Sequence, residues 1–169
     1  MANLSEPSGD AVAVVLAAGR STRMGGDNKL LLEIAPGVPV IRHTVENAMA
    51  AGLGCVLVVT GHEADRVRAA LSGLDCRFVH NPDYAEGLSG SIRAGFRVAV
   101  GEGAPGILVL LGDMPFLPHE AIAAVLEKAA DSPHRIVQAT HDGRPAHPVW
   151  LPARAAGLVE ALDGDRGVR

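Results

Sequence analysis

Several residue types that define whole classes of proteins are scarce in this sequence. Its 169 residues contain two cysteines, Cys55 and Cys76, which excludes both a disulfide scaffold and a four-cysteine zinc site. Both lie in apolar stretches, so we expect reduced core residues of a cytoplasmic protein. Aromatic residues make up only 3% of the chain, which predicts an aliphatic core and leaves few rings to stack on nucleic acid bases.

Basic runs and long apolar runs are missing as well. The 15 Lys and Arg residues are outnumbered by 19 Asp and Glu, and the resulting net charge of −4 argues against nucleic acid as the main partner. No apolar run reaches the roughly 20 residues that a bilayer requires, so no membrane association is predicted. Residues 1–10 are polar and lack a basic segment, so we expect a flexible N-terminus rather than a signal peptide.

Short apolar runs alternate with segments of helical periodicity along the chain. We expect strands at 11–18, 55–60, 76–80, 107–111, 135–140 and 146–151, and helices at 39–51, 62–71, 89–100, 118–130 and 153–162. This order predicts a single α/β domain over 1–169, with three αβα layers around a doubly wound, mostly parallel sheet. Ligands of such sheets bind beyond the carboxyl ends of the strands, so the loops after positions 18, 61, 80 and 111 are the candidate site.

A glycine-rich polar segment, 19–29, follows the first expected strand directly. Its backbone N–H groups could form an anion-binding nest, and Arg20, Arg23 and Lys29 add three cations to it. This combination suits a triphosphate, although a surface loop with solvated arginines would look similar. The spacing fits neither the Walker A pattern G-x-x-x-x-G-K-[ST] nor G-x-G-x-x-G, which argues against a P-loop kinase or GTPase.

Two later loops carry further candidate ligands. Asp113 follows the most apolar run of the chain, where its carboxylate could hold Mg²⁺ beside phosphate groups or simply cap a turn. The stretch 81–91 follows a strand and opens a helix, whose free N–H groups attract anions. Ser89 and Ser91 in this stretch could instead be helix N-caps.

The segment Leu16–Lys29, called the signature segment below, resembles a known family signature. Its sequence LAAGRSTRMGGDNK is similar to that of the molybdenum cofactor nucleotidyltransferases, and it matches every fixed position of L-A-[AG]-G-x-S-x-R-M-G followed by Lys. The pattern N-P-x-[YW]-x-x-G…S-[IL]-x-x-G over 81–95 resembles the cytidylyl branch, and G-D-M-P at 112–115 resembles the family's metal-binding motif. The resemblance implies a Rossmann-like fold of the glycosyltransferase-A type. It also implies a Mg²⁺-dependent transfer of CMP from CTP to the phosphate of molybdopterin.

The same resemblance assigns roles to individual residues. It implies nucleotide-binding roles for Leu16, Ala17, Ala18, Gly19, Arg20, Gly25, Asn81, Gly87, Ser91 and Gly112. Arg23 and Lys29 would neutralise the pyrophosphate leaving group, and Asp113 would be the magnesium ligand. The product of this reaction would be a molybdenum cofactor. Its delivery to an enzyme that uses it implies a transient contact with a molybdoenzyme.

Acceptor-side residues are implied by the last third of the chain. His147 lies in a segment similar to G-x-P-x-H-P, and Asp165 and Arg169 lie in one similar to G-D-x-G-x-R. The histidine could equally be structural, and the arginine could belong to a frayed terminus. Family patterns usually continue through a D-[IV]-D-T-P-type segment beyond the point where this chain stops. The second metal ligand is therefore open: Asp165 substitutes, the end is missing, or the protein is impaired.

Ala18 is the one position in the sequence that bears on base choice. The guanylyl branch resembles L-A-G-G and the cytidylyl branch L-A-A-G, and the methyl group of Ala18 would narrow the space beside the base. We therefore expect CTP rather than GTP. The alternatives are a guanylyltransferase, a transferase for a sugar, terpenoid or phospholactate acceptor, and a non-catalytic nucleotide-binding or partner-binding module.

Overall fold

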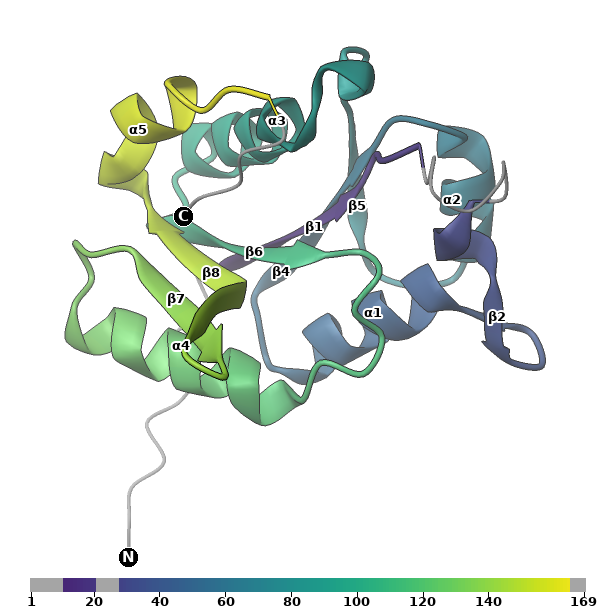
Figure 1. Ribbon diagram of the computed structural model, residues 1–169, viewed down its shortest axis with the longest axis horizontal. Helices are drawn as coiled ribbons and strands as arrows, with labels where there is room; N and C mark the ends of the chain where they lie inside the picture. The colour runs from purple at the N-terminus through teal and green to yellow at the C-terminus, as the bar shows by residue number, and fades with distance from the viewer. Residues whose placement is uncertain (1–10, 21–27, 165–169) are drawn as a thin grey trace, which may run out of the picture.

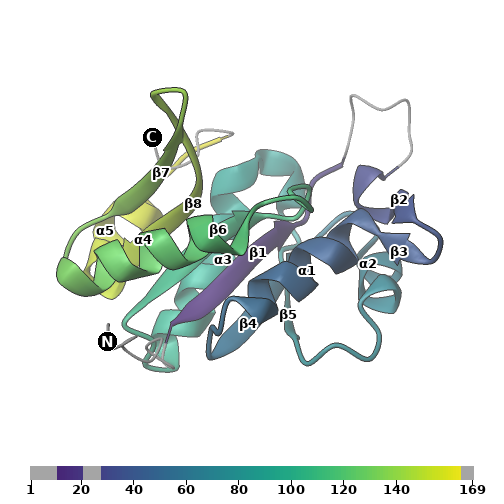
Figure 2. The ribbon, with the colours of Figure 1, turned by 90° about the horizontal axis from the view of Figure 1, so that it is seen from below.

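A mixed sheet separates two layers of helices (Figures 1 and 2). The computed structural model describes residues 11–20 and 28–164. The strands are β1 (Val12–Ala17), β2 (Glu33–Ala35), β3 (Val38–Pro39), β4 (Cys55–Thr60), β5 (Arg77–His80), β6 (Gly106–Leu111), β7 (Val137–His141) and β8 (Arg144–Pro152). The α-helices are α1 (Val40–Ala50), α2 (Ala64–Ala70), α3 (Leu88–Gly101), α4 (His119–Asp131) and α5 (Ala156–Glu160). Short 3-10 helices are η2 (Lys29–Leu31), η3 (Tyr84–Glu86) and η4 (Ala153–Ala155).

The main sheet has the strand order β5–β4–β1–β6–β8–β7, and β2 and β3 form a separate hairpin. The four strands β5, β4, β1 and β6 are parallel, whereas β8 runs antiparallel to both β6 and β7. This confirms the α/β fold with a doubly wound, mostly parallel sheet. The chain proceeds from β1 outward to β4 and β5 and then returns to the other side of β1 at β6. The strand order therefore reverses between β1 and β6, and such switch points are where these sheets bind ligands.

Both faces of the sheet are covered, which explains why its central strands are apolar throughout. Along β1, Ala13, Val15 and Ala17 face the core that contains α1, α2 and α4. Val14 and Leu16 face the second core, which contains α3 and α5. Figure 2 shows α1 and α4 in front of the sheet and α3 behind it. None of the helices in the described ranges has the length and hydropathy needed to cross a bilayer.

The expected strands and helices all occur, with ends shifted by a few residues. The predicted last helix divides into η4 and α5, and the β2–β3 hairpin was not predicted because each of its strands is only two or three residues long. The prediction of a serine N-cap for α3 is wrong. Gly87 occupies that position, while Ser89 and Ser91 lie within the helix and are buried.

The two cysteines lie at the edge of the core rather than inside it. Cys55 begins β4 and Cys76 precedes β5, and both are free and half-buried. Both are unpaired, as expected, and Cys76 packs against the core of buried residues. Partial burial, with a smaller effect of Asp75, raises the pKa of the Cys76 thiol.

Gly95, in the middle of α3, determines how closely that helix packs on the sheet. A Cβ atom there would overlap Val14 of β1 and would lie 3.1 Å from Cγ2 of Val59 on β4. Gly95→Ala should therefore lower the free energy of unfolding by about 1–3 kcal/mol through overpacking. Gly101→Ala in the same helix meets nothing within 4 Å and should be neutral or slightly stabilising. Urea unfolding of both variants checks this, and equal stabilities would contradict the close packing.

Candidate functional site

The switch point brings the ends of β1 and β6 to the same level of the sheet. Leu16 pairs with Leu111, and the N–H group of Gly112 donates to the carbonyl oxygen of Leu16 at 2.9 Å. Gly112 has no room for a side chain, because a Cβ atom would lie 2.8 Å from that oxygen and 2.9 Å from Cδ1 of Ile41. The segments that leave the two strands are therefore held against each other from their first residues.

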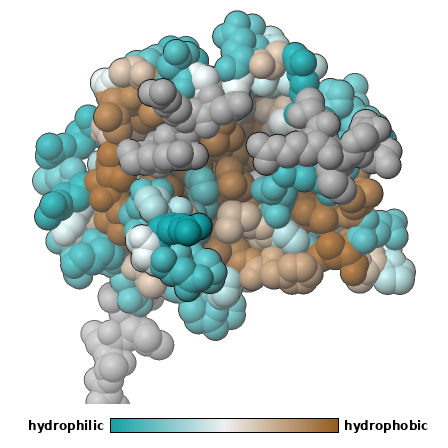
Figure 3. Space-filling model, in the orientation of Figure 1, coloured by the Kyte–Doolittle hydropathy of each residue, from teal (hydrophilic) through white to brown (hydrophobic). Residues whose placement is uncertain are grey.

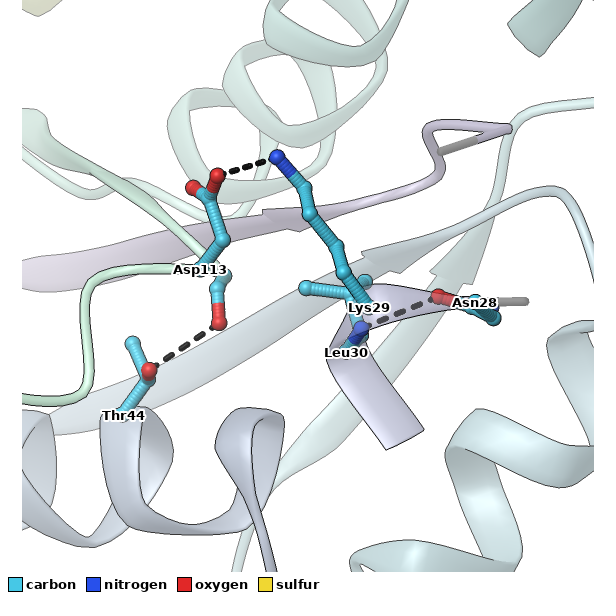
Figure 4. Close-up of polar contacts among 6 residues, drawn as sticks. Asn28, Lys29, Leu30, Thr44 and Asp113 are labelled. Carbon is cyan, nitrogen blue, oxygen red and sulfur yellow. Dashed lines mark hydrogen bonds and ion pairs between the residues drawn. The ribbon is translucent and has the colours of Figure 1, made fainter. Parts of the chain in front are cut away.

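An ion pair joins these two segments. The Nζ atom of Lys29, at the start of η2, donates to Oδ2 of Asp113, which follows β6 (Figure 4). The side chains are 45% and 32% exposed, so a ligand could reach both. The structure thus brings together two of the predicted catalytic residues, which are 84 positions apart in the sequence.

Asn28 fixes the backbone from which Lys29 projects. Its side-chain Oδ1 atom accepts a hydrogen bond from the N–H group of Leu30 at 3.1 Å and so caps η2 (Figure 4). Asn28 is only 4% exposed, and Leu30 is buried in the core beside it. Sequence reasoning did not identify Asn28, although an asparagine at the start of a helical turn is a recognisable capping signal.

Helix α1 holds the loop that carries Asp113. The hydroxyl oxygen of Thr44 lies 3.0 Å from the carbonyl oxygen of Gly112 (Figure 4). It also lies 3.1 Å from the carbonyl oxygen of Val40, so its proton can be donated to either. One turn later, Nδ2 of Asn47 donates to the carbonyl oxygen of Pro115 at 2.7 Å. These two polar residues were also missed, because only the fold shows that their side of the helix faces a loop.

The predicted ribose and base loop is built around Asn81. Its N–H group donates to the carbonyl oxygen of Thr60 at 2.8 Å, and its Nδ2 atom donates to Oγ of Ser91 at 3.1 Å. Its Oδ1 atom accepts from the N–H group of Asp83 at 3.1 Å. Asn81 and Ser91 are both at least 95% buried, and they join the end of β5 to the first turn of α3 next to Gly87.

Aromatic and cationic groups line the edge near the end of β4. The guanidinium of Arg20 lies 5.7 Å from the ring centre of Tyr84, close enough for a cation–π contact. The rings of Tyr84 and His62 are 6.0 Å apart and tilted. Neither aromatic residue was among the predicted site residues, although both lie in loops that the strand pattern had marked.

His147 lies on β8, which pairs with β6, the strand that Asp113 follows. Its Nδ1 atom is 3.4 Å from the carbonyl oxygen of Val109, at the outer limit of a hydrogen bond. Burial lowers the pKa of His147, and the contact with Val109 and the negative charge of Asp113 offset this only in part. The imidazole is therefore neutral at pH 7 and can donate or accept a hydrogen bond.

The structure describes twelve of the predicted site residues. They are Leu16, Ala17, Ala18, Gly19, Arg20, Lys29, Asn81, Gly87, Ser91, Gly112, Asp113 and His147. Apart from His147, they lie at the carboxyl ends of β1, β5 and β6, at η2 and at the start of α3. Arg23, Gly25, Asp165 and Arg169 lie outside the described residues, and their roles stay predictions.

An apolar groove adjoins the ion pair. Leu32, Ile34, Val40, Pro115 and Phe116 line it together with Lys29 and Asp113, and its volume is about 370 Å³. Figure 3 shows that hydrophobic residues reach this face of the molecule between hydrophilic patches. A second groove, of about 360 Å³, lies at the amino ends of β1 and β4 and contains no predicted site residue.

Among the described residues, Asp113 could hold a divalent cation. Within the described ranges no three His, Cys, Asp or Glu side chains form a cluster that could hold a metal. A single accessible carboxylate at the switch point nevertheless suits Mg²⁺, which is often held by one or two carboxylates together with substrate phosphates.

Comparison with known proteins places the chain among the nucleotidyltransferases. Residues 13–169 match the family described as MobA-like NTP transferase domain. The bifunctional protein GlmU of Nitratidesulfovibrio vulgaris (strain DSM 19637 / Miyazaki F) is 32% identical over 155 residues, which cover 90% of this chain and 34% of GlmU. The chain thus spans about a third of the length of this curated relative.

Two solved structures share the fold. A nucleotidyl transferase from Methanothermobacter thermautotroptrophicus is 32% identical with a TM-score of 0.73, and the match covers 92% of this chain and 77% of that one. Rv0371c from Mycobacterium tuberculosis H37Rv, in complex with manganese, is 29% identical with a TM-score of 0.71. That match covers 92% of this chain and 78% of the other.

His147 should make the stability of the protein depend on pH below neutrality. Because its pKa is lowered from the ordinary 6.5 on folding, the unfolded chain binds more protons as the solution is acidified. The free energy of unfolding should therefore fall as the pH drops from about 7 to about 5. His147→Gln should flatten this profile, whereas His141→Gln, at a side chain that is 87% exposed, should not. Identical pH profiles for the wild type and His147→Gln would contradict the burial argument.

Proposed function

The chain belongs to the MobA-like NTP transferase domain family, and on that premise we propose that it is a cytidylyltransferase. It would transfer CMP from CTP to the phosphate of a molybdopterin-type acceptor and release pyrophosphate. The similarity to nucleotidyl transferases of solved structure supports the reaction class. The base and the acceptor rest on the sequence motifs, so the experiments below test them separately.

The observation that carries the proposal is the meeting of Lys29 and Asp113 at the switch point, beside the signature segment. A nucleoside triphosphate requires cationic groups that neutralise its phosphates and a carboxylate that holds its metal ion. In the ligand-free protein the two side chains neutralise each other. A bound triphosphate would offer Lys29 a new anionic partner and leave the carboxylate of Asp113 available.

The nucleotide would lie across the carboxyl ends of the parallel strands. The backbone of Ala17–Arg20 would bind the triphosphate, and Arg23 and Lys29 would neutralise the pyrophosphate as it leaves. Asn81, Gly87 and Ser91 would hold the ribose and base, and the hydrogen bonds that join Asn81 to Ser91 and Asp83 orient that loop. Gly112, whose backbone is held against the end of β1, would contribute to the nucleotide site from the end of β6.

The chemical step is an in-line displacement at the α-phosphorus of CTP. An oxygen of the acceptor phosphate forms a new bond to this phosphorus, and the bond to the oxygen that bridges to the β-phosphate breaks. The leaving group is pyrophosphate, and the product contains a new phosphoanhydride. Since the second pKa of a phosphomonoester is about 6, the acceptor is already ionised at neutral pH and requires no strong base. The protein therefore contributes positioning and charge neutralisation.

Asp113 would hold the divalent cation that this reaction uses. A bound Mg²⁺ would supply positive charge at the α-phosphate, where negative charge is concentrated in the transition state. The manganese in the solved structure of Rv0371c supports a divalent-metal site in the family. His147, whose pKa is lowered by burial, would hydrogen-bond the acceptor rather than neutralise it, and Asp165 and Arg169 would complete the acceptor side.

Thermal unfolding with CTP, GTP, UTP and ATP, each with and without Mg²⁺, tests nucleotide binding. At about 100 times the Kd, CTP with Mg²⁺ should raise the Tm of the protein by roughly 5–10 °C.

Lys29→Ala should lower the turnover rate by about 100-fold, by analogy with loss of one preorganised donor. Asp113→Asn should abolish the Mg²⁺-dependent shift and turnover. Lys128→Ala, at the other lysine of the chain, is the matched control and should behave as the wild type.

The outcomes of this series separate the candidate functions. Release of pyrophosphate with molybdopterin, but not with sugar, terpenoid or lactate phosphates, would support the proposed acceptor. A shift with GTP in place of CTP would favour a guanylyltransferase. Nucleotide binding without turnover on any of these acceptors would instead support a non-catalytic module. A Lys29→Ala variant with normal turnover would remove Lys29 from the phosphate site.

Ala18 should contribute to the preference for CTP. It is 4% exposed and packs against Gly61, so its methyl group occupies space at the end of β1. Ala18→Gly would enlarge this space and should reduce the ratio of CTP to GTP affinity. Calorimetric titration of both nucleotides into the wild type and the variant measures this ratio. An unchanged ratio would show that Ala18 does not select the base.

A further inference from the structure

The turn after β4 joins the end of β1 to the loop that follows β5. Gly61, in this turn, has no space for a side chain, because a Cβ atom would lie 2.5 Å from Cβ of Tyr84 and 2.8 Å from Cβ of Ala18. The N–H group of His62 donates to the carbonyl oxygen of Ala18 at 3.1 Å. Tyr84 is therefore held close to the start of the signature segment, although it belongs to a different loop.

The ring of Tyr84 contacts a cation and a second ring. The guanidinium carbon of Arg20 lies over the ring, 5.7 Å from its centre, which is within the range of a cation–π contact. The ring of His62 lies 6.0 Å away and is tilted by 47°. Tyr84 is half-buried, whereas Arg20 is exposed. The ring, which Gly61 confines at its Cβ atom, is thus a fixed surface beside an exposed cation.

The type of partner matters for what Arg20 can do. A guanidinium is attracted to the face of a ring, while its N–H groups point outward in its own plane. A carboxylate would instead occupy those N–H groups and neutralise the charge. Arg77 and Arg97 each pair with a glutamate in this way, but no carboxylate in the described ranges pairs with Arg20. Contact with a ring holds a cation in place without neutralising it.

We propose that Tyr84 is a positioning residue for Arg20. The face of its ring keeps the guanidinium at the end of β1, with the N–H groups directed to the two phosphates of CTP that leave as pyrophosphate. Tyr84 thereby connects the loop that would hold the base with the segment that would hold the phosphates. The role in nucleotide binding rests on the proposed function, whereas the contact between the ring and Arg20 does not.

The benefit of the ring is a smaller loss of entropy when the nucleotide binds. An exposed arginine side chain has many rotamers, and immobilising it on a ligand costs free energy. A ring that already favours one position of the guanidinium reduces that cost. An exposed cation–π contact changes an equilibrium by about threefold, so we expect Tyr84 to raise the affinity for CTP by a factor of this size. The hydroxyl group of Tyr84 has no part in this effect.

The NMR spectrum of the ligand-free protein tests the contact directly. Protons over the face of an aromatic ring are shifted upfield by its ring current, so the side-chain signals of Arg20 should lie upfield. Tyr84→Leu, which keeps a Cβ atom beside Gly61, should move these signals downfield, whereas Tyr84→Phe should leave them in place. Arg20→Gln identifies the signals because it removes them. Unchanged Arg20 signals in Tyr84→Leu would overturn the proposal.

The same contact can be followed from the ring if Tyr84→Leu folds poorly. Tyr84 is the only tyrosine of the chain, so its ring signals are assigned without ambiguity. They should shift in Arg20→Gln, because the cation beside the ring is lost. Ring signals that stay unchanged in Arg20→Gln would also overturn the proposal.

Calorimetric titration with CTP and with CMP, both in the presence of Mg²⁺, tests what the contact is for. Tyr84→Leu should weaken CTP binding about threefold and leave CMP binding unchanged, because CMP lacks the two phosphates assigned to Arg20. Tyr84→Phe should restore the affinity for CTP. Phe78→Leu is the matched control, because it removes a similar contact, 5.6 Å from Arg68, that is not part of the candidate site. Equal weakening of both nucleotides in Tyr84→Leu would contradict a role through Arg20.

A double-mutant cycle separates positioning from a general structural role. Arg20→Gln should weaken CTP binding about 10-fold, the effect of losing one hydrogen bond between charged groups. If Tyr84 acts through Arg20, adding Tyr84→Leu to this variant should weaken binding no further. Additive losses would overturn the proposal. If the wild type bound neither nucleotide, the proposed function would fail, while the Arg20 signals would still decide whether the ring of Tyr84 holds the guanidinium.

Discussion

The parallel pairing of β1 with β6 is the constraint on which the candidate site depends. Because Leu16 and Leu111 are in register, both strands end at the same level, and Gly112 bonds directly to Leu16. The segment after β6 therefore starts against the end of β1, and its Asp113 meets Lys29. β4 lies on the other side of β1, so its following turn reaches the signature segment as well.

Buried and half-buried polar groups, rather than surface charges, maintain this arrangement. Thr44 and Asn47 bind carbonyl groups of the Asp113 loop, Asn28 caps the turn of Lys29, and Asn81 joins β5 to α3. Losing such a buried partner costs more than losing an exposed one, because the remaining group cannot turn to water. The exposed pairs Arg77–Glu102 and Arg97–Glu160 contribute little by comparison. Rigid loops of this kind suit a reaction that depends mainly on positioning.

The class of the fold could be predicted because its signals are local. A parallel strand covered on both faces is apolar throughout, and its surface helices show a 3.6-residue period, so β1, β4 and β6 and the helices between them were recognisable. The serine caps failed for an equally physical reason. Gly87 adopts a φ of 115° and occupies the N-cap position, which leaves Ser89 and Ser91 inside α3, where Ser91 pairs with Asn81.

The sequence by itself determined the order of strands and helices, the composition of the core and the residues of the signature segment, because these follow from hydropathy, turn chemistry and motif spacing. Only the tertiary structure decided which distant residues meet. The contact of Lys29 with Asp113, the support of both by Asn28 and Thr44, and the bond from His62 to Ala18 all depend on the strand order. A strand pattern does not specify that order, since neighbours in a doubly wound sheet come from distant parts of the chain. The partners of buried polar groups are therefore set by packing rather than by local sequence.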